Sequence, residues 1–203
     1  MTPRLALIDY GAGNLTSVRK GFAAAGAELY TPVSPADIRH AAGIVVPGVG
    51  HFSATASLHD GWRASIHARL QDGIPLLGIC LGMQWLFEGS AEAPGLTGLG
   101  VMRGSCTRIA AAAPLKVPHV GWNRLTRSRD SALLHDVPAD AHVYFTHAYA
   151  APVTSDCIAT CRHGSEFAAA VEREHVCGVQ FHPEKSSDAG LRILRNFVAM
   201  VGT

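Results

Sequence analysis

Hydrophobic residues in the first 90 positions form four short apolar runs separated by segments of mixed pattern. The runs are Arg4–Asp9, Ala27–Tyr30, Ala42–Val46 and Ile74–Ile79. Nearly continuous apolar runs are typical of strands in a parallel sheet that is covered on both faces. The intervening patterns predict helices over about Thr16–Ala25, Leu58–Gln71 and Leu81–Glu88. This alternation predicts a doubly wound, mostly parallel sheet flanked by helices.

The second half of the chain has a different pattern, with short strands and hairpins in place of alternating strands and helices. The predicted strands are Val101–Ile109, Arg124–Leu125, His142–Ala148, Cys157–Arg162, Ala168–Arg173 and Val176–Gln180. A final helix is predicted over Asp188–Val201, because its apolar residues fall on one stripe. No repeat, linker or long charge run divides the chain. We therefore predict a single α/β domain over residues 1–203, with short antiparallel strands in its second half.

Composition narrows the class of protein. The 203 residues are 48% hydrophobic and 16% charged, which argues against disorder. The formal net charge of +1 gives no reason to expect nucleic acid or a membrane as a partner. Asp9 interrupts the first apolar run, and we predict neither a signal peptide nor a membrane span. Five cysteines, an odd and low number, favour a reduced, cytoplasmic protein.

A sharp turn is predicted where the run Ile74–Ile79 meets the next helix. The segment Gly78–Gly82, GICLG, places a cysteine between two glycines. Glycines let the backbone pack closely around a strained central residue, which exposes the sulfur of Cys80 at the carboxyl end of the sheet. The helix N-terminus favours a thiolate, and the N–H of Leu81 is well placed for an oxyanion. A buried structural cysteine is the alternative that this segment alone leaves open.

The segment Gly178–Glu184, GVQFHPE, places a histidine at the end of a predicted strand. A cysteine nucleophile needs a base, and the base needs a third group to fix its tautomer. Pro183 fixes φ and stiffens the spacing between His182 and Glu184. Alone, the segment fits a strand-end histidine beside a solvated glutamate. Together with the turn at Cys80, it favours a Cys-His-Glu triad.

Three further segments bear on the chemistry. The glycines of Pro47–Gly50 allow a backbone flip that turns an N–H toward an oxyanion, although an ordinary glycine turn fits equally. Gly11–Gly13 begins like a dinucleotide-binding loop, but Thr16 stands where the third glycine is needed. The spacing of Cys157, Cys161 and His163 matches no strong zinc pattern. We predict no cofactor and no metal.

Cys80 in GICLG, with His182 and Glu184 in HPE, resembles the triad-type class I glutamine amidotransferases. Six blocks in the family's order narrow this to a resemblance to the glutaminase subunits of imidazole glycerol phosphate synthase. The blocks are Ile8–Leu15, Pro47–Gly50, Gly78–Gln84, Pro118–Asn123, Tyr144–Tyr149 and Gly178–Ser186. They span most of the chain, so the resemblance is specific.

The resemblance implies that the Cys80 thiolate attacks the side-chain amide of L-glutamine. His182 would protonate the departing ammonia and then activate water, while Glu184 holds the imidazole. The same resemblance implies further binding positions. These are Leu81 with Val49 or Gly50 for the oxyanion, Gln84 for glutamine, and Glu92 for the α-ammonium of the substrate.

Ammonia must be kept from water, so the resemblance also implies a heterodimer with a separate (β/α)8-barrel cyclase subunit. That subunit would use the ammonia to make imidazole glycerol phosphate and aminoimidazole carboxamide ribotide, a step of histidine biosynthesis. Positions at or near the partner face match Asn14, Trp122, Asn123 and Lys185. An exposed tryptophan suits an interface anchor, and a core tryptophan is the alternative at Trp122.

Two positions depart from the family pattern. Ala148 stands where serine is common, which removes a hydroxyl contact to substrate, and Thr146 replaces a commoner apolar residue. Three other functions stay open at this point. They are a triad amidotransferase serving another acceptor, a solitary cysteine hydrolase such as a peptidase or deglycase, and a non-catalytic module of the same fold.

Overall fold

The computed structural model describes residues 2–201, and it contains one large central sheet. The strands of this sheet are β1 Arg4–Leu7, β2 Glu28–Tyr30, β3 Gly43–Val46, β4 Leu76–Ile79, β8 Thr126–Arg127, β11 Cys157–His163, β12 Ser165–Arg173 and β13 Val176–Val179. Their spatial order is β2-β1-β3-β4-β13-β12-β11-β8. The ends of the predicted single domain, Met1 and residues 202–203, lie outside the described residues, and its extent stays a prediction.

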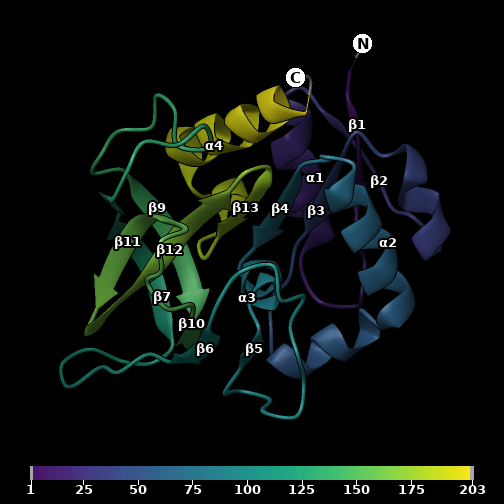
Figure 1. Ribbon diagram of the computed structural model, residues 1–203. Coiled ribbons are helices and arrows are strands. Elements are labelled where there is room, and N and C mark those ends of the chain that lie inside the picture. The colour runs from purple at the N-terminus through teal and green to yellow at the C-terminus, as the bar shows by residue number, and fades with distance from the viewer. Residues whose placement is uncertain (1, 202–203) are drawn as a thin grey trace.

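The central sheet changes direction at β13. From β2 to β13 every neighbouring pair is parallel, whereas the pairs β13–β12, β12–β11 and β11–β8 are antiparallel. Figure 1 shows the antiparallel hairpins on one side of the molecule and the parallel strands with α2 (Asp60–Gln71) on the other. The prediction of a mostly parallel sheet, with antiparallel strands in the second half, is confirmed.

Helices cover both faces of the sheet. The remaining helices are α1 Leu15–Ala24, α3 Leu81–Leu86 and α4 Ser187–Met200, with short 3-10 helices η1 Pro35–His40, η2 Phe52–Ser57 and η3 Pro183–Lys185. Side chains alternate along β1, so Leu5 and Leu7 pack in one core with α1 and α4. Ala6 and Ile8 pack in the other core with α2 and α3. Burial on both faces explains the continuous apolar run at this strand.

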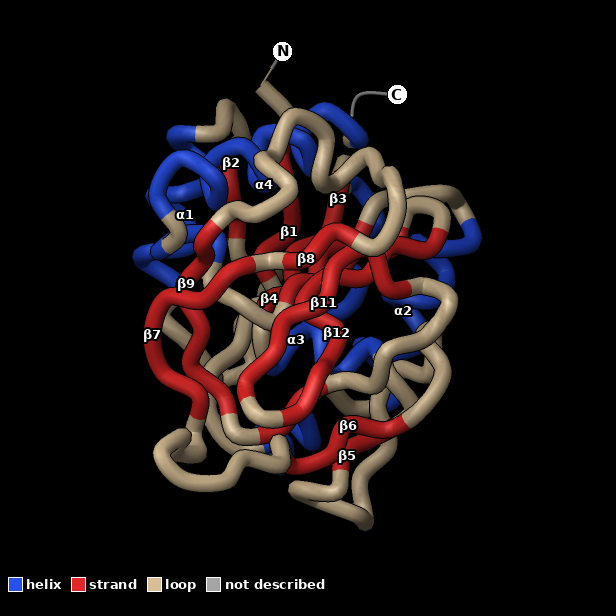
Figure 2. The backbone as a smooth tube through the Cα atoms, turned by 90° about the vertical axis from the view of Figure 1, so that its left-hand side faces the viewer, coloured by secondary structure: helices blue, strands red, loops and turns tan. Residues whose placement is uncertain are grey.

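Two smaller sheets flank the central one (Figure 2). One contains β10 Tyr149–Ala150, β6 Ser105–Arg108 and β5 Gly89–Ser90, in that order. The other pairs β7, His119–Arg124, with β9, His142–His147, in antiparallel register. The carboxyl end of β9 brings its backbone to the region where the central strands β4 and β13 end, because the carbonyl of Thr146 contacts Cys80.

Several predicted boundaries were wrong. The strand predicted at Arg124–Leu125 overlaps only the last residue of β7. The rest of β7 was missed because its apolar residues Val120 and Trp122 are exposed and show no inward-facing pattern. The strand predicted over Val101–Ile109 is confined to Ser105–Arg108, after a bend in which Gly104 has a φ of 93°. Helix α2 begins at Asp60, since the ring of His59 caps it by accepting the Gly61 N–H at 3.2 Å.

Candidate active site

Cys80 and His182 follow two strands that lie side by side. Cys80 comes directly after β4, and His182 follows β13 by three positions. The two strands are parallel neighbours, with Ile79 paired to Val179. The carboxyl ends of parallel strands meet at one edge of a sheet, and that edge is where open α/β sheets place their ligands. The topology therefore brings the predicted nucleophile and its base together.

The predicted strand-to-helix turn is present at Cys80. Its φ of 53° and ψ of −106° lie outside the regions that a non-glycine residue usually adopts. A Cβ at Gly78 would lie 2.7 Å from the carbonyl oxygen of Gly82, and a Cβ at Gly82 would overlap the carbonyl oxygen of Val46. Both glycines are therefore required for the backbone to pass so closely around Cys80.

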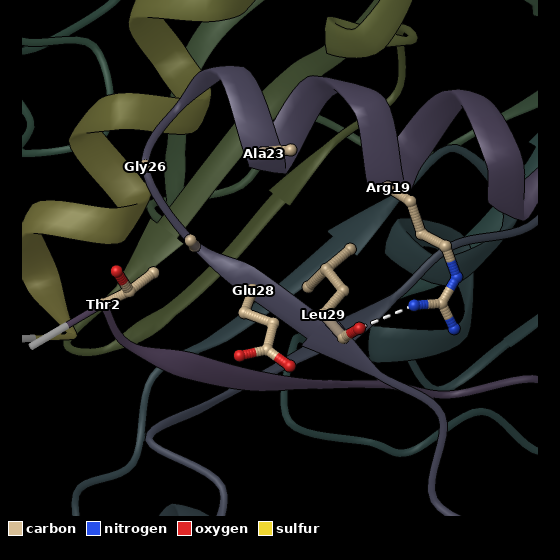
Figure 3. Close-up of a pocket in the computed structure, with 7 residues that line it drawn as sticks. Thr2, Arg19, Ala23, Gly26, Glu28 and Leu29 are labelled. Atoms are coloured by element: carbon tan, nitrogen blue, oxygen red, sulfur yellow. Dashed lines mark hydrogen bonds between the residues drawn. The ribbon is translucent and has the colours of Figure 1, made fainter.

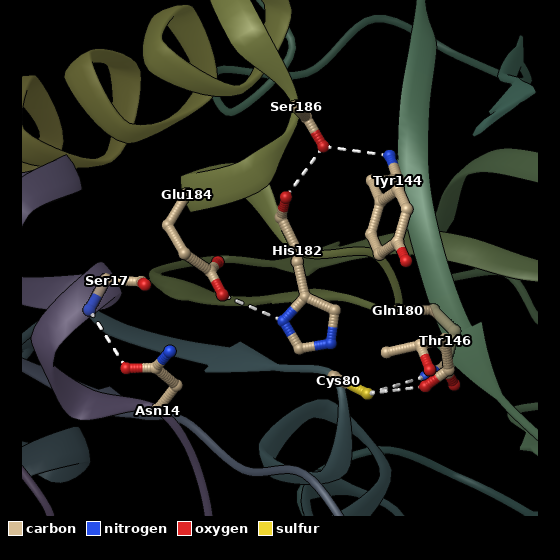
Figure 4. A network of polar contacts seen from close by, with 9 residues as sticks. All are labelled: Asn14, Ser17, Cys80, Tyr144, Thr146, Gln180, His182, Glu184 and Ser186. Carbon is tan, nitrogen blue, oxygen red and sulfur yellow. Dashed lines mark hydrogen bonds and ion pairs between the residues drawn. The ribbon is translucent and has the colours of Figure 1, made fainter. Parts of the chain in front are cut away.

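His182 and Glu184 form a buried pair. Their Nδ1 and Oε1 atoms are 2.8 Å apart, and the two side chains are only 2% and 3% exposed. The main chain is fixed as well, because Ser186 Oγ donates to the carbonyl of His182 at 2.7 Å and accepts the Tyr144 N–H at 3.0 Å. Figure 4 shows this network and the imidazole between Glu184 and Cys80. Within residues 2–201, the outer nitrogen of His182, Nε2, has no hydrogen-bond partner.

The surroundings of His182 favour its charged form. Burial alone would lower the pKa of the imidazole, since a charged group loses hydration there. The interactions of the imidazole with Cys80 and Glu184 outweigh that effect and raise the pKa of His182 to about 9. An imidazole of raised basicity beside a thiol is suited to take the thiol proton.

The sulfur of Cys80 has two polar neighbours besides the imidazole (Figure 4). It lies 3.8 Å from the carbonyl oxygen of Thr146, to which the thiol donates, and 3.6 Å from Nε2 of Gln180, which donates to the sulfur. Cys80 is 4% exposed. The structure thus places the sulfur of Cys80 beside a hydrogen-bond acceptor, a hydrogen-bond donor and the imidazole of His182.

The N–H of Leu81, which was predicted to bind an oxyanion, already donates a hydrogen bond within the chain. The amide of Leu81 donates to the carbonyl oxygen of Gly48 at 3.3 Å, so the loop Pro47–Gly50 covers this donor. Val49 in that loop is 40% exposed, and Gly50 has a φ of 122°. A peptide flip at Gly48–Val49 would turn the carbonyl away and an N–H toward the site. The geometry shows a closed oxyanion position rather than an open one.

The two predicted glutamine-binding side chains have different surroundings. Gln84, on α3, is 4% exposed and donates through Nε2 to the Tyr149 carbonyl at 2.8 Å and to Gln180 Oε1 at 3.1 Å. Glu92 is half-buried, and its Oε2 accepts the N–H of Phe52 at 2.8 Å. Both binding roles stay predictions.

The four predicted partner-face residues also differ. Trp122 is 53% exposed and stands edge-on to Tyr144, so it is not a core tryptophan. Lys185 is exposed, and its Nζ lies 5.9 Å above the Tyr144 ring. Asn14 caps α1 by accepting the Ser17 N–H at 3.3 Å (Figure 4). The amide of Asn123 binds inside the chain, to His119 and to the Arg162 carbonyl. Their interface roles stay predictions.

Sequence reasoning missed two polar side chains at this site. Gln180, fully buried, contacts the Cys80 sulfur, and Tyr10 lies so close to the Pro47–Gly50 loop that a Cβ at Gly48 would overlap its hydroxyl. A polar residue at the end of an apolar strand was the available signal for Gln180. Tyr10 carried no comparable signal, because its position next to Gly48 depends on how β1 and β3 are paired.

Other places in the molecule offer less chemistry. Figure 3 shows a surface pocket between α1 and β2, where Arg19 donates to the Leu29 carbonyl at 2.6 Å and Glu28 is the acidic side chain. None of Cys80, His182 and Glu184 lines this pocket. Within residues 2–201 no group of three or more His, Cys, Asp or Glu side chains is arranged to hold a metal. No helix in that part of the chain is long and apolar enough to cross a membrane.

Comparison with known proteins identifies the family. Residues 6–201 match the family model described as glutamine amidotransferase class-I. The chain belongs to this family. Two similar relatives are the proteins named imidazole glycerol phosphate synthase subunit HisH from Deinococcus radiodurans and Xanthomonas campestris. They are 43% and 46% identical to this chain, covering 96% and 97% of it and 93% and 97% of their own lengths.

Solved structures show the same fold at lower identity. A crystal structure of a glutamine amidotransferase superposes with a TM-score of 0.76 at 19% identity, covering 98% of this chain and 99% of its own. The structure of PurLQS from Thermotoga maritima superposes with a TM-score of 0.75 at 14% identity, covering 98% of this chain and 99% of the matched one. The predicted class I glutamine amidotransferase fold is confirmed.

Proposed function

We propose that this class I amidotransferase chain is the glutaminase subunit of imidazole glycerol phosphate synthase. It hydrolyses L-glutamine to glutamate and ammonia through Cys80, His182 and Glu184, and delivers the ammonia to a cyclase subunit. The observation that carries the proposal is the convergence of these residues from adjacent parallel strands, with His182 and Glu184 2.8 Å apart. The relatives named HisH support the choice of this synthase.

The reaction follows from the positions of the three side chains. Nε2 of His182 takes the proton of the Cys80 thiol, and the thiolate attacks the side-chain amide carbon of glutamine. The imidazolium then gives the proton to the departing nitrogen, which leaves as ammonia. A glutamyl thioester remains on Cys80. Water, deprotonated by the same imidazole, hydrolyses the thioester to glutamate. Glu184 holds Nδ1 throughout, so the proton-accepting nitrogen stays directed at the reacting atoms.

The closed oxyanion position supports a resting state for this subunit. The Leu81 N–H is bonded to Gly48, so a tetrahedral oxyanion would meet one blocked donor. We propose that activation flips the loop, which frees Leu81 and adds the N–H of Val49 or Gly50. Gln84 and Glu92 then hold the side-chain amide and α-ammonium of glutamine. A structure of the activated complex with glutamine bound and the Gly48–Leu81 hydrogen bond intact would contradict this step.

The proposed partner is a (β/α)8-barrel cyclase subunit in the cytoplasm, which consumes ammonia as it forms. Ammonia released into bulk water would be protonated and lose its nucleophilicity, so a tight heterodimer is needed. The exposed Trp122 and Lys185, with Asn14 and Asn123, would lie at or near the joined surface. The cyclase would then make imidazole glycerol phosphate and aminoimidazole carboxamide ribotide from the phosphoribulosyl-formimino intermediate.

The test is glutamate release from glutamine, measured for the chain alone and with the cyclase and its ligand. We expect strong stimulation by the liganded partner and complete loss of release in Cys80→Ala. Glutaminase activity that ignores this partner would keep the chemistry and refute the choice of acceptor. Absence of glutamate release under every condition would refute the glutaminase itself.

A further inference from the structure

Gln180 is a fully buried polar residue at the carboxyl end of an apolar strand. It follows β13 and is 0% exposed. A buried amide costs free energy unless its oxygen and its nitrogen both find partners. Its main-chain N–H donates to the carbonyl of Ala169, so the side chain is not needed to satisfy the backbone. Both ends of that side chain are bonded within the active site.

A chain of hydrogen bonds fixes which end of Gln180 faces the sulfur. The Tyr149 carbonyl can only accept, so the Gln84 side-chain atom beside it must be the donor Nε2. The same Nε2 contacts Gln180 at 3.1 Å, and the atom it meets must therefore be the acceptor Oε1. The amide nitrogen of Gln180 is then directed at the Cys80 sulfur, at 3.6 Å. The orientation follows from three contacts rather than from one amide assignment.

The two neighbours of the sulfur respond differently to ionisation. The thiol donates its proton to the Thr146 carbonyl, and a thiolate has no proton to donate there. The Gln180 N–H meets the sulfur in both states, and its hydrogen bond is stronger when the sulfur is charged. Thr146 therefore favours the thiol and Gln180 favours the thiolate.

We infer that Gln180 is a further catalytic residue, whose amide stabilises the Cys80 thiolate and links the nucleophile to the glutamine-contacting side chain of Gln84. This inference rests on the proposed glutaminase chemistry for its purpose. The hydrogen bond from Gln180 to the Cys80 sulfur does not depend on the substrate or the partner. A role in packing alone would leave the ionisation of the sulfur unchanged when the donor is replaced by a side chain of similar size.

The test is a pH titration of the thiolate, followed by its ultraviolet absorbance in the isolated chain. The titration of Cys80→Ala is subtracted. Burial raises the pKa of the thiols of Cys106, Cys157 and Cys177, and raises that of Cys161 to about 12, so these four stay protonated around neutral pH. The difference signal then belongs to Cys80, coupled to His182.

Gln180→Met keeps the volume and removes the donor. We expect its titration midpoint to rise by about one pH unit, since a hydrogen bond to the charged form is lost. Gln180→Glu retains an acceptor for Gln84 and places a carboxyl oxygen at the sulfur, so its midpoint should rise further. A midpoint equal to the parent's in a folded Gln180→Met protein would overturn the inference.

Thr160→Val is the matched control for lost stability. Thr160 is a buried polar residue on β11, and its hydroxyl bonds Glu166 at 3.3 Å rather than any residue of the triad. The titration midpoint of Thr160→Val should equal that of the parent, even if the substitution lowers the unfolding free energy. If Gln180→Met does not fold, Gln180→Glu carries the test. Because the titration uses neither glutamine nor the cyclase, its outcome is separate from that of the glutamate-release experiment.

Discussion

The two nitrogens of His182 have different surroundings, and that difference defines its chemistry. Nδ1 is bound to Glu184 at 2.8 Å, whereas Nε2 has no hydrogen-bond partner in the described chain. In the neutral ring, a carboxylate on Nδ1 selects the tautomer with its proton on that nitrogen. The lone pair then resides on Nε2, facing the thiol. The short spacing of two residues between His182 and Glu184 is possible because η3 begins at Pro183 and turns the chain back.

The hydroxyl of Tyr10 is buried without a hydrogen-bond partner in residues 2–201. Its burial raises the pKa of the phenol, with the charge of Cys80 as a second cause. A buried unpaired hydroxyl costs about 1–3 kcal/mol, so we expect Tyr10→Phe to stabilise the chain by about 1 kcal/mol. Urea unfolding of the two proteins measures this difference.

Tyr30→Phe is the control for the tyrosine prediction. The hydroxyl of Tyr30 donates to the Asp37 carbonyl at 2.9 Å. Its removal should lower the unfolding free energy by about 0.5–1 kcal/mol, the opposite sign. If Tyr10→Phe also destabilises the chain, the Tyr10 hydroxyl has a partner and the present interpretation is wrong.

At the scale of elements, the turn between β4 and α3 depends on glycine. A Cβ at Gly82 would overlap the Val46 carbonyl oxygen, which is main chain of a buried strand and cannot move aside cheaply. We expect Gly82→Ala to lower the unfolding free energy by about 3 kcal/mol and to displace Cys80. Chemical denaturation measures the first effect, and glutamate release with the partner measures the second.

Gly95→Ala provides the comparison for the turn. A Cβ at Gly95 meets nothing within 4 Å, so the same chemical change should leave stability within about 0.5 kcal/mol of the parent. Equal stabilities for the two alanine variants would show that the close packing at Gly82 is not required.

The elements that could be predicted are those whose burial produces a clear period. The strands at Leu5, Ile44 and Leu77 are covered on both faces and form continuous apolar runs, so their type and their positions along the chain followed from the sequence. Strand β7 could not be predicted in the same way, because its pattern is set by pairing with β9 and by an exposed face that carries Trp122. The local pattern of apolar residues carries no information about which strands pair.

The same limit separates the triad from its surroundings. Cys80, His182 and Glu184 lie in segments with local constraints, a glycine turn and a proline spacing, which mark them in the sequence. The contact of Gln180 with Cys80 spans 100 positions along the chain, and it depends on the parallel register of β4 and β13. Likewise, the closed oxyanion position depends on how Gly48 approaches Leu81, which composition and spacing leave open.

At the scale of the whole molecule, the central sheet has two packed faces and one edge at which the proposed catalytic residues meet. β4 and β13 sit at the centre of the strand order, so Cys80 and His182 follow strands that have neighbours on both sides. A separate two-stranded sheet supplies β9, whose backbone contacts Cys80 through Thr146 and which pairs with β7 bearing Trp122. The two-stranded sheet of β7 and β9 therefore connects the exposed Trp122 to Cys80.

Two buried histidines make the stability of the molecule depend on pH. Burial lowers the pKa of His119 to about 4, with His163 as a second cause, and that of His147 to about 3. Both lie in the two-stranded sheet of β7 and β9, where His119 Nδ1 is 3.1 Å from His147 Nε2. In the unfolded chain they titrate near the ordinary value of 6.5. Their neutral burial therefore stabilises the fold above that pH, and the stabilisation is lost as the pH falls below it.

His182 has the opposite sign. Its pKa of about 9 exceeds the ordinary 6.5, so its contribution is complete below 6.5 and is lost as the pH rises through about 9. Together, His119, His147 and His182 place the greatest stability between pH 6.5 and about pH 9. Lowering the pH from about 7 to about 5 should cost about 2 kcal/mol for each of His119 and His147, since one pH unit is worth about 1.4 kcal/mol.

Urea unfolding at the two pH values checks this expectation. His119→Gln removes one of the titrating groups, so the fall in unfolding free energy between neutral and acid pH should shrink by about 2 kcal/mol. His67→Gln is the matched control, because His67 is exposed on α2 and is solvated in both states. A fall that is equally steep in His119→Gln and in the parent would show that His119 does not govern acid stability. A smaller fall in His119→Gln would instead show that acid destabilises the sheet of β7 and β9. That sheet carries both the exposed Trp122 and the backbone that contacts Cys80.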